Sequence, residues 1–237
     1  MRLQTTNEPQ PFSLRRVFKG ASIYSLGEVL VKASGFFLIP VYTRVLTPAD
    51  YGIIGYLQVL VQIGATVLAF GFFGAQTRYY YENNADQRSI GEFLFTINVF
   101  PVAVALVIGV PVSLLGVRAG WVFGSQGIPF SPLVVLALWT ILLNVLSQNA
   151  ANWFRTRQQF TVGALLQFGK FVSVTVCSLV LVVGFDYGAY GKIAGTFLGS
   201  LLFLLASYWA YARNFILRFS RVAFKYAIGF GSAIVIH

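Results

Sequence analysis

Three lysines and a glutamate lie inside long apolar stretches of this 237-residue sequence. Lys170 is the most isolated of them, because it lies near the middle of the stretch 161–184, which contains no acidic residue. A charge at the centre of a membrane helix costs about 2.5–3.5 kcal/mol, so such residues usually face water, an opposite charge or a ligand. Lys170 is therefore the leading candidate for a ligand-binding residue, together with Gln167 about one helical turn before it.

Glu28 and Lys32 are four residues apart in the stretch 21–43 and therefore share one face of a helix. Two interpretations remain open. Either the two charges neutralise each other, or Lys32 is free to bind a ligand or Glu28 exchanges protons. Lys192 lies near the start of the stretch 189–212, where its long side chain is expected to extend to the membrane interface.

Two stripes of polar side chains recur every four residues within apolar stretches: Gln58, Gln62 and Thr66 in 51–73, and Asn144, Gln148 and Asn152 in 132–153. This spacing places each set on one face of a helix. The side chains either form hydrogen bonds between helices, which are frequent in membrane bundles, or line a hydrated cavity. The second interpretation makes the five amides of these stripes candidate ligand-binding residues.

The motifs of common enzyme chemistry are absent from the sequence. It contains no Asp-x-Asp pair, no nucleophile elbow, no phosphate-binding glycine-rich loop and no His/Cys cluster, and it has seven acidic residues in total. The single Cys177 provides neither a disulfide nor a metal-ligand spacing. We therefore expect no catalytic residue, no metal and no cofactor, and a protein that is not an enzyme.

The composition places these residues in a membrane. Hydrophobic residues make up 57% of the chain and charged residues only 10%, compared with about 25% charged in soluble domains. The apolar segments are each long enough for a helix to cross about 30 Å of hydrocarbon. They are 21–43, 51–73, 92–116, 132–153, 161–184 and 189–212. The predicted fold class is an all-α polytopic membrane protein with a six-helix transmembrane lobe plus the start of a seventh helix.

The net charge of +10 follows a topological pattern. Basic residues gather in 1–20, 78–88, 155–157 and 213–225, whereas the two intervening loops carry only Arg44 and Arg118. The positive-inside rule places the N-terminus and the basic stretches in the cytoplasm. The charge is therefore no indication of nucleic-acid binding.

The chain divides into a cytoplasmic N-terminal segment (1–20), the six-helix lobe (21–212), a basic cytoplasmic linker (213–225) and the start of a truncated seventh helix (226–237). The final apolar run is too short to span a membrane, so we expect the natural chain to continue beyond His237. A complete six-helix protein with a short interfacial C-terminus is the alternative.

The polar decapeptide "TRVLTPADYG" (43–52) separates the first two apolar segments. Thr47 is placed to cap a helix, Pro48 fits its first position, and Asp50 completes a capping box. We expect these residues to be structural.

The stretch "LIPVYTRVLTPADYGIIGYLQ", the following "GFFGAQTRYYYE" and the later "NWFRTRQQF" together resemble the Wzx-type oligosaccharide flippase family. This family is part of a superfamily that also includes multidrug-extrusion transporters. The resemblance implies an N-terminal lobe in the bacterial inner membrane. It also implies an undecaprenyl-diphosphate-linked oligosaccharide as substrate, flipped from the cytoplasmic to the periplasmic leaflet, and other polysaccharide-assembly proteins as partners.

In that setting Lys170, Lys32, Gln167 and the amides of the two stripes would bind the substrate, and Glu28 would couple transport to an ion. A drug or metabolite exporter of the same superfamily and a non-transporting membrane scaffold are the alternatives. A cationic drug would require carboxylates in the cavity, for which only Glu28 and Glu92 are available.

Overall fold

Apolar helices of membrane-spanning length dominate the structure. The computed structural model describes residues 29, 33, 36, 38–83, 86–120, 122–123 and 128–235. The α-helices are α2 (Pro48–Ala69), α3 (Phe72–Glu82), α4 (Gln87–Val104), α5 (Val110–Arg118), α6 (Val135–Thr156), α7 (Phe160–Leu179), α8 (Gly188–Ala212) and α9 (Arg221–Val235). Single π-helical turns (Ala105–Gly109, Phe130–Val134 and Val180–Gly184) continue or precede these helices, and two-residue strands β1 (Val122–Phe123) and β2 (Ile128–Pro129) pair in the loop before α6.

Five helical segments among the described residues are long and apolar enough to cross a membrane: Pro48–Glu82, Gln87–Arg118, Phe130–Thr156, Phe160–Gly184 and Gly188–Ala212. They contain the last five apolar segments of the sequence, so the all-α membrane class is confirmed. Of the first expected segment, residues 38–43 are helical. Glu28 and Lys32 lie outside the described residues, as does the segment 1–20.

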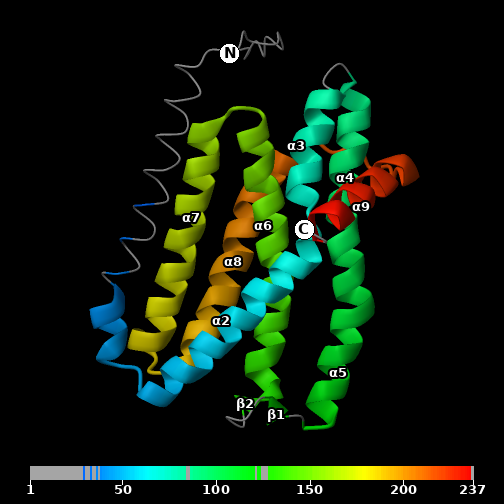
Figure 1. Ribbon diagram of the computed structural model, residues 1–237. Coiled ribbons are helices and arrows are strands. Elements are labelled where there is room, and N and C mark those ends of the chain that lie inside the picture. Colours follow the sequence, from blue (N-terminus) through cyan, green and yellow to red (C-terminus); the bar gives the residue numbers. More distant parts are fainter. Residues whose placement is uncertain are drawn as a thin grey trace.

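The helices are packed side by side, with α6 in contact with α2, α7 and α8 (Figure 1). Closest packing is between α7 and α8, because α8 presents glycines to the backbone of α7. A Cβ atom on Gly195 would lie 2.4 Å from Ser178 Cα, and one on Gly199 would lie 2.5 Å from Val174 Cα. Small residues at this four-residue spacing let membrane helices approach closely.

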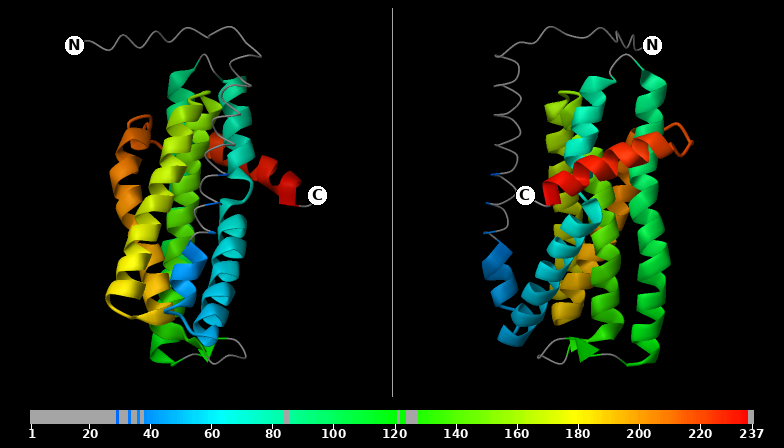
Figure 2. Two further views of the ribbon diagram at one scale, coloured as in Figure 1. Left: turned by 90° about the vertical axis from the view of Figure 1, so that its left-hand side faces the viewer. Right: turned by 45° about the vertical axis from the view of Figure 1, so that its right-hand side comes forward.

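The second membrane segment is broken where α2 ends and α3 begins. Phe70 and Gly71 both have left-handed backbone conformations, with φ of 42° and 71°, and the chain then continues as α3 to Glu82. Helix α9 crosses the bundle at this level (Figure 2). A Cβ atom on Gly71 would lie 2.9 Å from Gly231 Cα, so the two glycines permit the crossing.

Helix α9 begins at Arg221, inside the stretch that we expected to be a linker. The Ser220 hydroxyl accepts a hydrogen bond from the Ala223 N–H at 3.3 Å and so caps the first turn. Serine is a favoured N-cap residue. The helix thus starts before its apolar run at 226.

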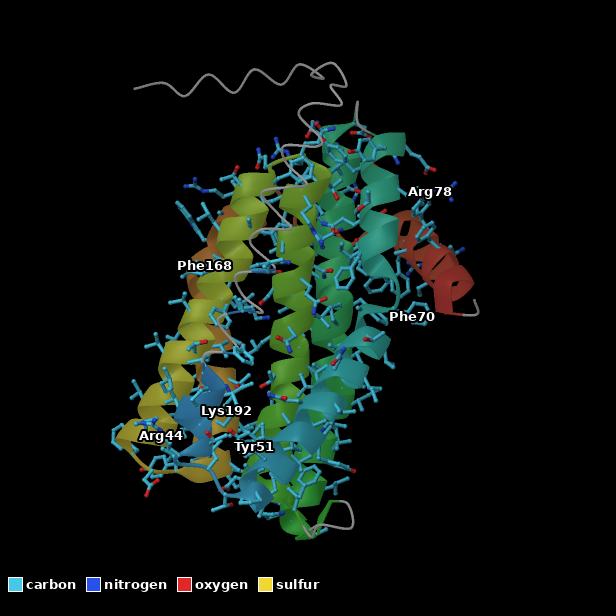
Figure 3. The ribbon with its side chains drawn as sticks, turned by 60° about the vertical axis from the view of Figure 1, so that its left-hand side comes forward. Arg44, Tyr51, Phe70, Arg78, Phe168 and Lys192 are labelled. Carbon is cyan, nitrogen blue, oxygen red and sulfur yellow. The ribbon has the colours of Figure 1, made fainter. Side chains whose placement is uncertain are left out.

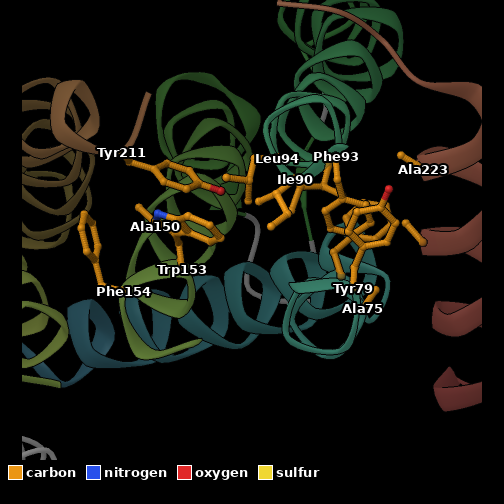
Figure 4. Close-up of a cluster of buried hydrophobic side chains, with 13 residues drawn as sticks. Ala75, Tyr79, Ile90, Phe93, Leu94, Ala150, Trp153, Phe154, Tyr211 and Ala223 are labelled. Carbon is orange, nitrogen blue, oxygen red and sulfur yellow. The ribbon is translucent and has the colours of Figure 1, made fainter. Parts of the chain in front are cut away.

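Aromatic side chains fill the end of the bundle where α3, α6 and α8 finish and α4 starts. Figure 4 shows Tyr79 stacked on Phe93, with Trp153 and Tyr211 on the α6 and α8 side. The ring centroids of Tyr79 and Phe93 are 4.1 Å apart. This cluster fixes the relative positions of the four helices.

Candidate functional site

Lys170 lies between α7 and α6, and its ammonium group is held by a neutral side chain. Its Nζ donates a hydrogen bond to Asn144 Oδ1 at 2.7 Å. No carboxylate of the described residues is within salt-bridge distance of it. Glu92, which could have neutralised it, lies instead beside Arg88 (3.4 Å) and Arg218 (3.6 Å). The charge of Lys170 is therefore shared with an amide dipole and is not cancelled by an acid in this part of the structure.

The α6 stripe serves two purposes. Asn144 binds Lys170, and Gln148, one turn further on, is exposed. Asn152 is buried and donates to Gln76 Oε1 at 2.8 Å and to Phe73 O at 3.0 Å. The stripe is thus exposed at Gln148 and forms interhelical hydrogen bonds at Asn152.

Asn152 is one member of a buried polar network between α3, α4, α6 and α8. The Tyr211 hydroxyl is the centre of the network, since it accepts from Asn98 Nδ2 at 2.9 Å and from Gln76 Nε2 at 3.4 Å. Asn149 Nδ2 donates to Asn98 Oδ1 at 3.3 Å. These four residues, Gln76, Asn98, Asn149 and Tyr211, were not predicted from the sequence, although their polar side chains occur within or beside apolar segments.

The α2 stripe is exposed along its whole length. Gln58, Gln62 and Thr66 are all exposed, and the Thr66 hydroxyl donates to the Gln62 carbonyl within its own helix at 2.9 Å. A shallow groove of about 270 Å³ runs beside Gln62 and Thr66. Within the described residues, the side chains of Gln58 and Gln62 form no hydrogen bond to another helix. The cavity-wall interpretation fits this stripe better than interhelical bonding.

An apolar groove of about 650 Å³ lies next to this shallow groove, and Val59, Ile63 and Val67 of α2 line both. Tyr56, Ile63 and Val67 line one side, and Phe100 and Val104 of α4 line the other. This groove has the chemistry of a hydrocarbon-binding surface.

Lys192 is half-buried and contacts Tyr42, near the end of the helix that precedes α2. Its Nζ donates to the Tyr42 hydroxyl at 3.2 Å and lies 4.5 Å from the centroid of the same ring. A lysine over an aromatic face is stabilised electrostatically. Figure 3 shows Lys192 between α7 and the first turns of α2.

The structure therefore joins Lys170 to Asn144 and leaves Gln148, Gln58 and Gln62 accessible. Gln167 is half-buried about one turn from Lys170 on α7. The described residues hold no group of three His, Cys, Asp or Glu side chains arranged for a metal. Cationic and amide side chains among apolar helices define a multi-pass membrane protein with a polar site inside its bundle.

Comparison with known proteins gives the family. Residues 17–236 match the polysaccharide biosynthesis protein family, and the chain belongs to it. A relative in Haemophilus influenzae, described as "Lsg locus putative protein 1", is 24% identical over 230 residues, which are 94% of this chain and 53% of that protein.

Two solved structures show the same fold. One is the outward-facing conformation of a multidrug resistance MATE family transporter of the MOP superfamily, with a TM-score of 0.62, 14% identity, and coverage of 90% of this chain and 49% of that one. The other is a MOP superfamily transporter from Pyrococcus furiosus, with a TM-score of 0.60, 15% identity, and coverage of 92% and 50%. The chain thus spans about half the length of these relatives.

Proposed function

We propose that this chain forms part of a transporter that flips an undecaprenyl-diphosphate-linked oligosaccharide from the cytoplasmic to the periplasmic leaflet of a bacterial inner membrane. The observation that carries the proposal is the 2.7 Å hydrogen bond between Lys170 Nζ and Asn144 Oδ1. A lysine whose described contact is a neutral amide keeps its positive charge for a ligand. A diphosphate is an anion that such a charge can bind.

The other parts of the substrate also have matching surfaces. Hydroxyl-rich sugars suit the exposed amides of Gln58, Gln62 and Gln148, which can both donate and accept hydrogen bonds. The lipid tail can remain in the bilayer or rest against the apolar groove between α2 and α4. Membership of the polysaccharide biosynthesis family supports a glycan substrate.

Export of a cationic drug is less well supported by the charges of the site. One structural relative is a multidrug resistance transporter. A cationic drug would need a free carboxylate. Of the two candidates, Glu28 is outside the described residues and Glu92 lies beside Arg88 and Arg218. A scaffold without transport activity does not account for Lys170 or for the exposed amides of α2, because charged and polar side chains in membrane helices are costly unless they bind a partner.

The distribution of basic residues supports the proposed orientation in the membrane. By the positive-inside rule, it favours a cytoplasmic N-terminus and a cytoplasmic loop between α6 and α7. The flippase then acts on the product of cytoplasmic glycan assembly, with other polysaccharide-assembly proteins as partners and without catalysing a covalent step.

Depletion of the protein in its own host tests the proposal. The expected result is accumulation of the lipid-linked oligosaccharide in the cytoplasmic leaflet, measured by its inaccessibility to a periplasmic glycan-modifying enzyme. Unchanged glycan export combined with new sensitivity to cationic drugs would replace the proposal with the drug-exporter alternative.

A further inference from the structure

Two further cations, Arg155 and Lys192, lie on either side of Lys170 along the bundle axis. Arg155 is at the end of α6, and its Nη2 donates to Asn152 Oδ1 at 3.3 Å. It is half-buried. Gly163 of α7 packs against its stem, since a Cβ atom on Gly163 would lie 3.3 Å from Arg155 Cγ. The side chain therefore lies at the interface of α6 and α7, the same interface that contains Lys170.

Arg155 and Lys170 lie on a common line along this interface. Gly163 and Lys170 are two helical turns apart on α7, and Asn144 and Arg155 are three turns apart on α6. With a rise of about 1.5 Å per residue, these two spacings separate the cations by roughly 10–16 Å along the axis. The exposed amide of Gln148 lies between them on α6.

Lys192 continues the series toward the opposite end of the bundle. The Ser173 hydroxyl donates to Gly199 O at 2.8 Å, which sets the relative level of α7 and α8. Lys170 is three residues from Ser173 toward the cytoplasmic end, and Lys192 is seven residues from Gly199 toward the outer end. The helical rise then gives roughly 15 Å between the two lysines.

All three cations have neutral hydrogen-bond acceptors: Asn152 for Arg155, Asn144 for Lys170 and Tyr42 for Lys192. Neither lysine has a carboxylate of the described residues within salt-bridge distance. A second arginine is present nearby: the guanidinium carbon of Arg157 lies 5.5 Å from the centroid of the Trp153 ring. Arg155 and Arg157 carry the same charge two residues apart but have different surroundings.

We propose that Arg155 and Lys192 are the entry and exit sites for the diphosphate group, with Lys170 between them. This inference rests on the proposed function. A guanidinium can bind a phosphate with two parallel hydrogen bonds, which suits capture at the cytoplasmic end. A lysine ammonium is a single point charge with freely rotating donors, which suits transfer and release.

Binding of undecaprenyl diphosphate to the purified full chain in nanodiscs tests the entry site. Arg155→Gln is expected to weaken binding by about tenfold or more, the effect of losing a hydrogen bond to a charged group. Arg157→Gln is the matched control, with the same change of charge, and should alter binding by less than about twofold. The affinity of Arg155→Lys for undecaprenyl diphosphate should lie between those of the Arg155→Gln and Arg157→Gln variants. If Arg155→Gln fails to fold, the comparison of Arg155→Lys with Arg157→Lys decides the same question.

The exit site is tested by glycan export in cells at matched protein levels. Lys192→Gln should lower the export rate, and Lys192→Arg should restore export in part. Equal binding by the Arg155→Gln and Arg157→Gln variants, or normal export by Lys192→Gln, would overturn the path while leaving a role for Lys170 intact. If the wild-type protein does not bind undecaprenyl diphosphate, both the path and the proposed function are wrong.

Discussion

The carboxylate of Asp50 accepts a hydrogen bond from the backbone N–H of Ala189, 3.1 Å away and 139 residues later in the chain. The same carboxylate accepts from the Thr47 N–H at 2.9 Å and the Thr47 hydroxyl at 2.7 Å, while the Asp50 N–H donates to that hydroxyl. Asp50 therefore caps its own helix, α2, and also binds the first turn of α8. Gly188 leaves room for this contact, because a Cβ atom there would lie 3.2 Å from Asp50 Oδ1.

Removal of this carboxylate should destabilise the protein more than removal of the Thr47 cap. Thr47→Ala should cost about 0.5–2 kcal/mol of stability, because one backbone donor of α2 loses its acceptor, and Thr47→Ser should restore it. Asp50→Ala should cost more, because α8 also loses an acceptor. Thermal unfolding of the purified variants measures which substitution lowers the stability more. If Thr47→Ala and Thr47→Ser both stop export at normal protein levels, a direct role in transport would replace capping.

The loop between α6 and α7 should be accessible only from the cytoplasm. Gln159 is exposed in this loop, so Gln159→Cys in a Cys177→Ala background gives a single label site. An impermeant thiol reagent should label it in inverted vesicles and leave it unlabelled in intact cells. Labelling from the periplasm would reverse the topology and the direction of transport with it.

The fold class and the capping box could be predicted from the sequence because both depend on local patterns. The lengths of the apolar segments predict membrane helices, and Thr47, Pro48 and Asp50 are within four positions of one another. The contact of Asp50 with Ala189 could not be predicted, because it depends on how α2 and α8 pack. The break at Phe70 and Gly71 was also missed, since the apolar run continues through it.

In the candidate site, too, the local pattern could be predicted from the sequence and the tertiary contacts could not. Helical spacing correctly placed Asn144, Gln148 and Asn152 on one face of α6. It could not separate Asn144, which binds Lys170, from Asn152, which joins a buried network. Partners on other helices, such as Tyr42 for Lys192, depend on tertiary packing that a single sequence does not reveal.

The buried network should depend on the hydroxyl of Tyr211. Tyr211→Phe leaves the Asn98 and Gln76 amides without their shared acceptor, and it should cost about 1–3 kcal/mol for the unsatisfied donors. Tyr208→Phe is the matched control, because the Tyr208 ring packs edge-on against Tyr211 and its hydroxyl has no hydrogen bond within the described residues. Denaturant unfolding measures both variants. Equal stability of the two would show that the network contributes nothing to folding.

Close packing of α7 and α8 should tolerate no added methyl group at Gly199. Gly199→Ala would place Cβ 2.5 Å from Val174 Cα, so the helices must separate, with a cost of about 1–3 kcal/mol from overpacking. Gly55→Ala in α2 is the control, since that position has no neighbouring atom within 4 Å and alanine favours a helix. Thermal unfolding should separate the two variants clearly. A Gly199→Ala protein as stable as Gly55→Ala would contradict this packing.

Lys170 should be required for transport and dispensable for folding. Lys170→Gln removes a charge that is costly inside a membrane bundle, so stability should be unchanged or higher while glycan export is lost. Lys170→Arg should keep part of the activity, because the charge remains although its geometry changes. Asn144→Asp is the most specific test of the charge. It keeps the lysine and places a carboxylate oxygen where the amide oxygen now lies, 2.7 Å from Lys170 Nζ.

The Asn144→Asp protein should fold at least as well as the wild type and should export little glycan, because the ion pair cancels the charge that binds the diphosphate. Export is measured as surface glycan at matched protein levels, with thermal unfolding in parallel. Normal export by Lys170→Gln would reject the role of the lysine. Loss of folded protein in Lys170→Gln, together with full export by Asn144→Asp, would show instead that Lys170 acts as a structural cation.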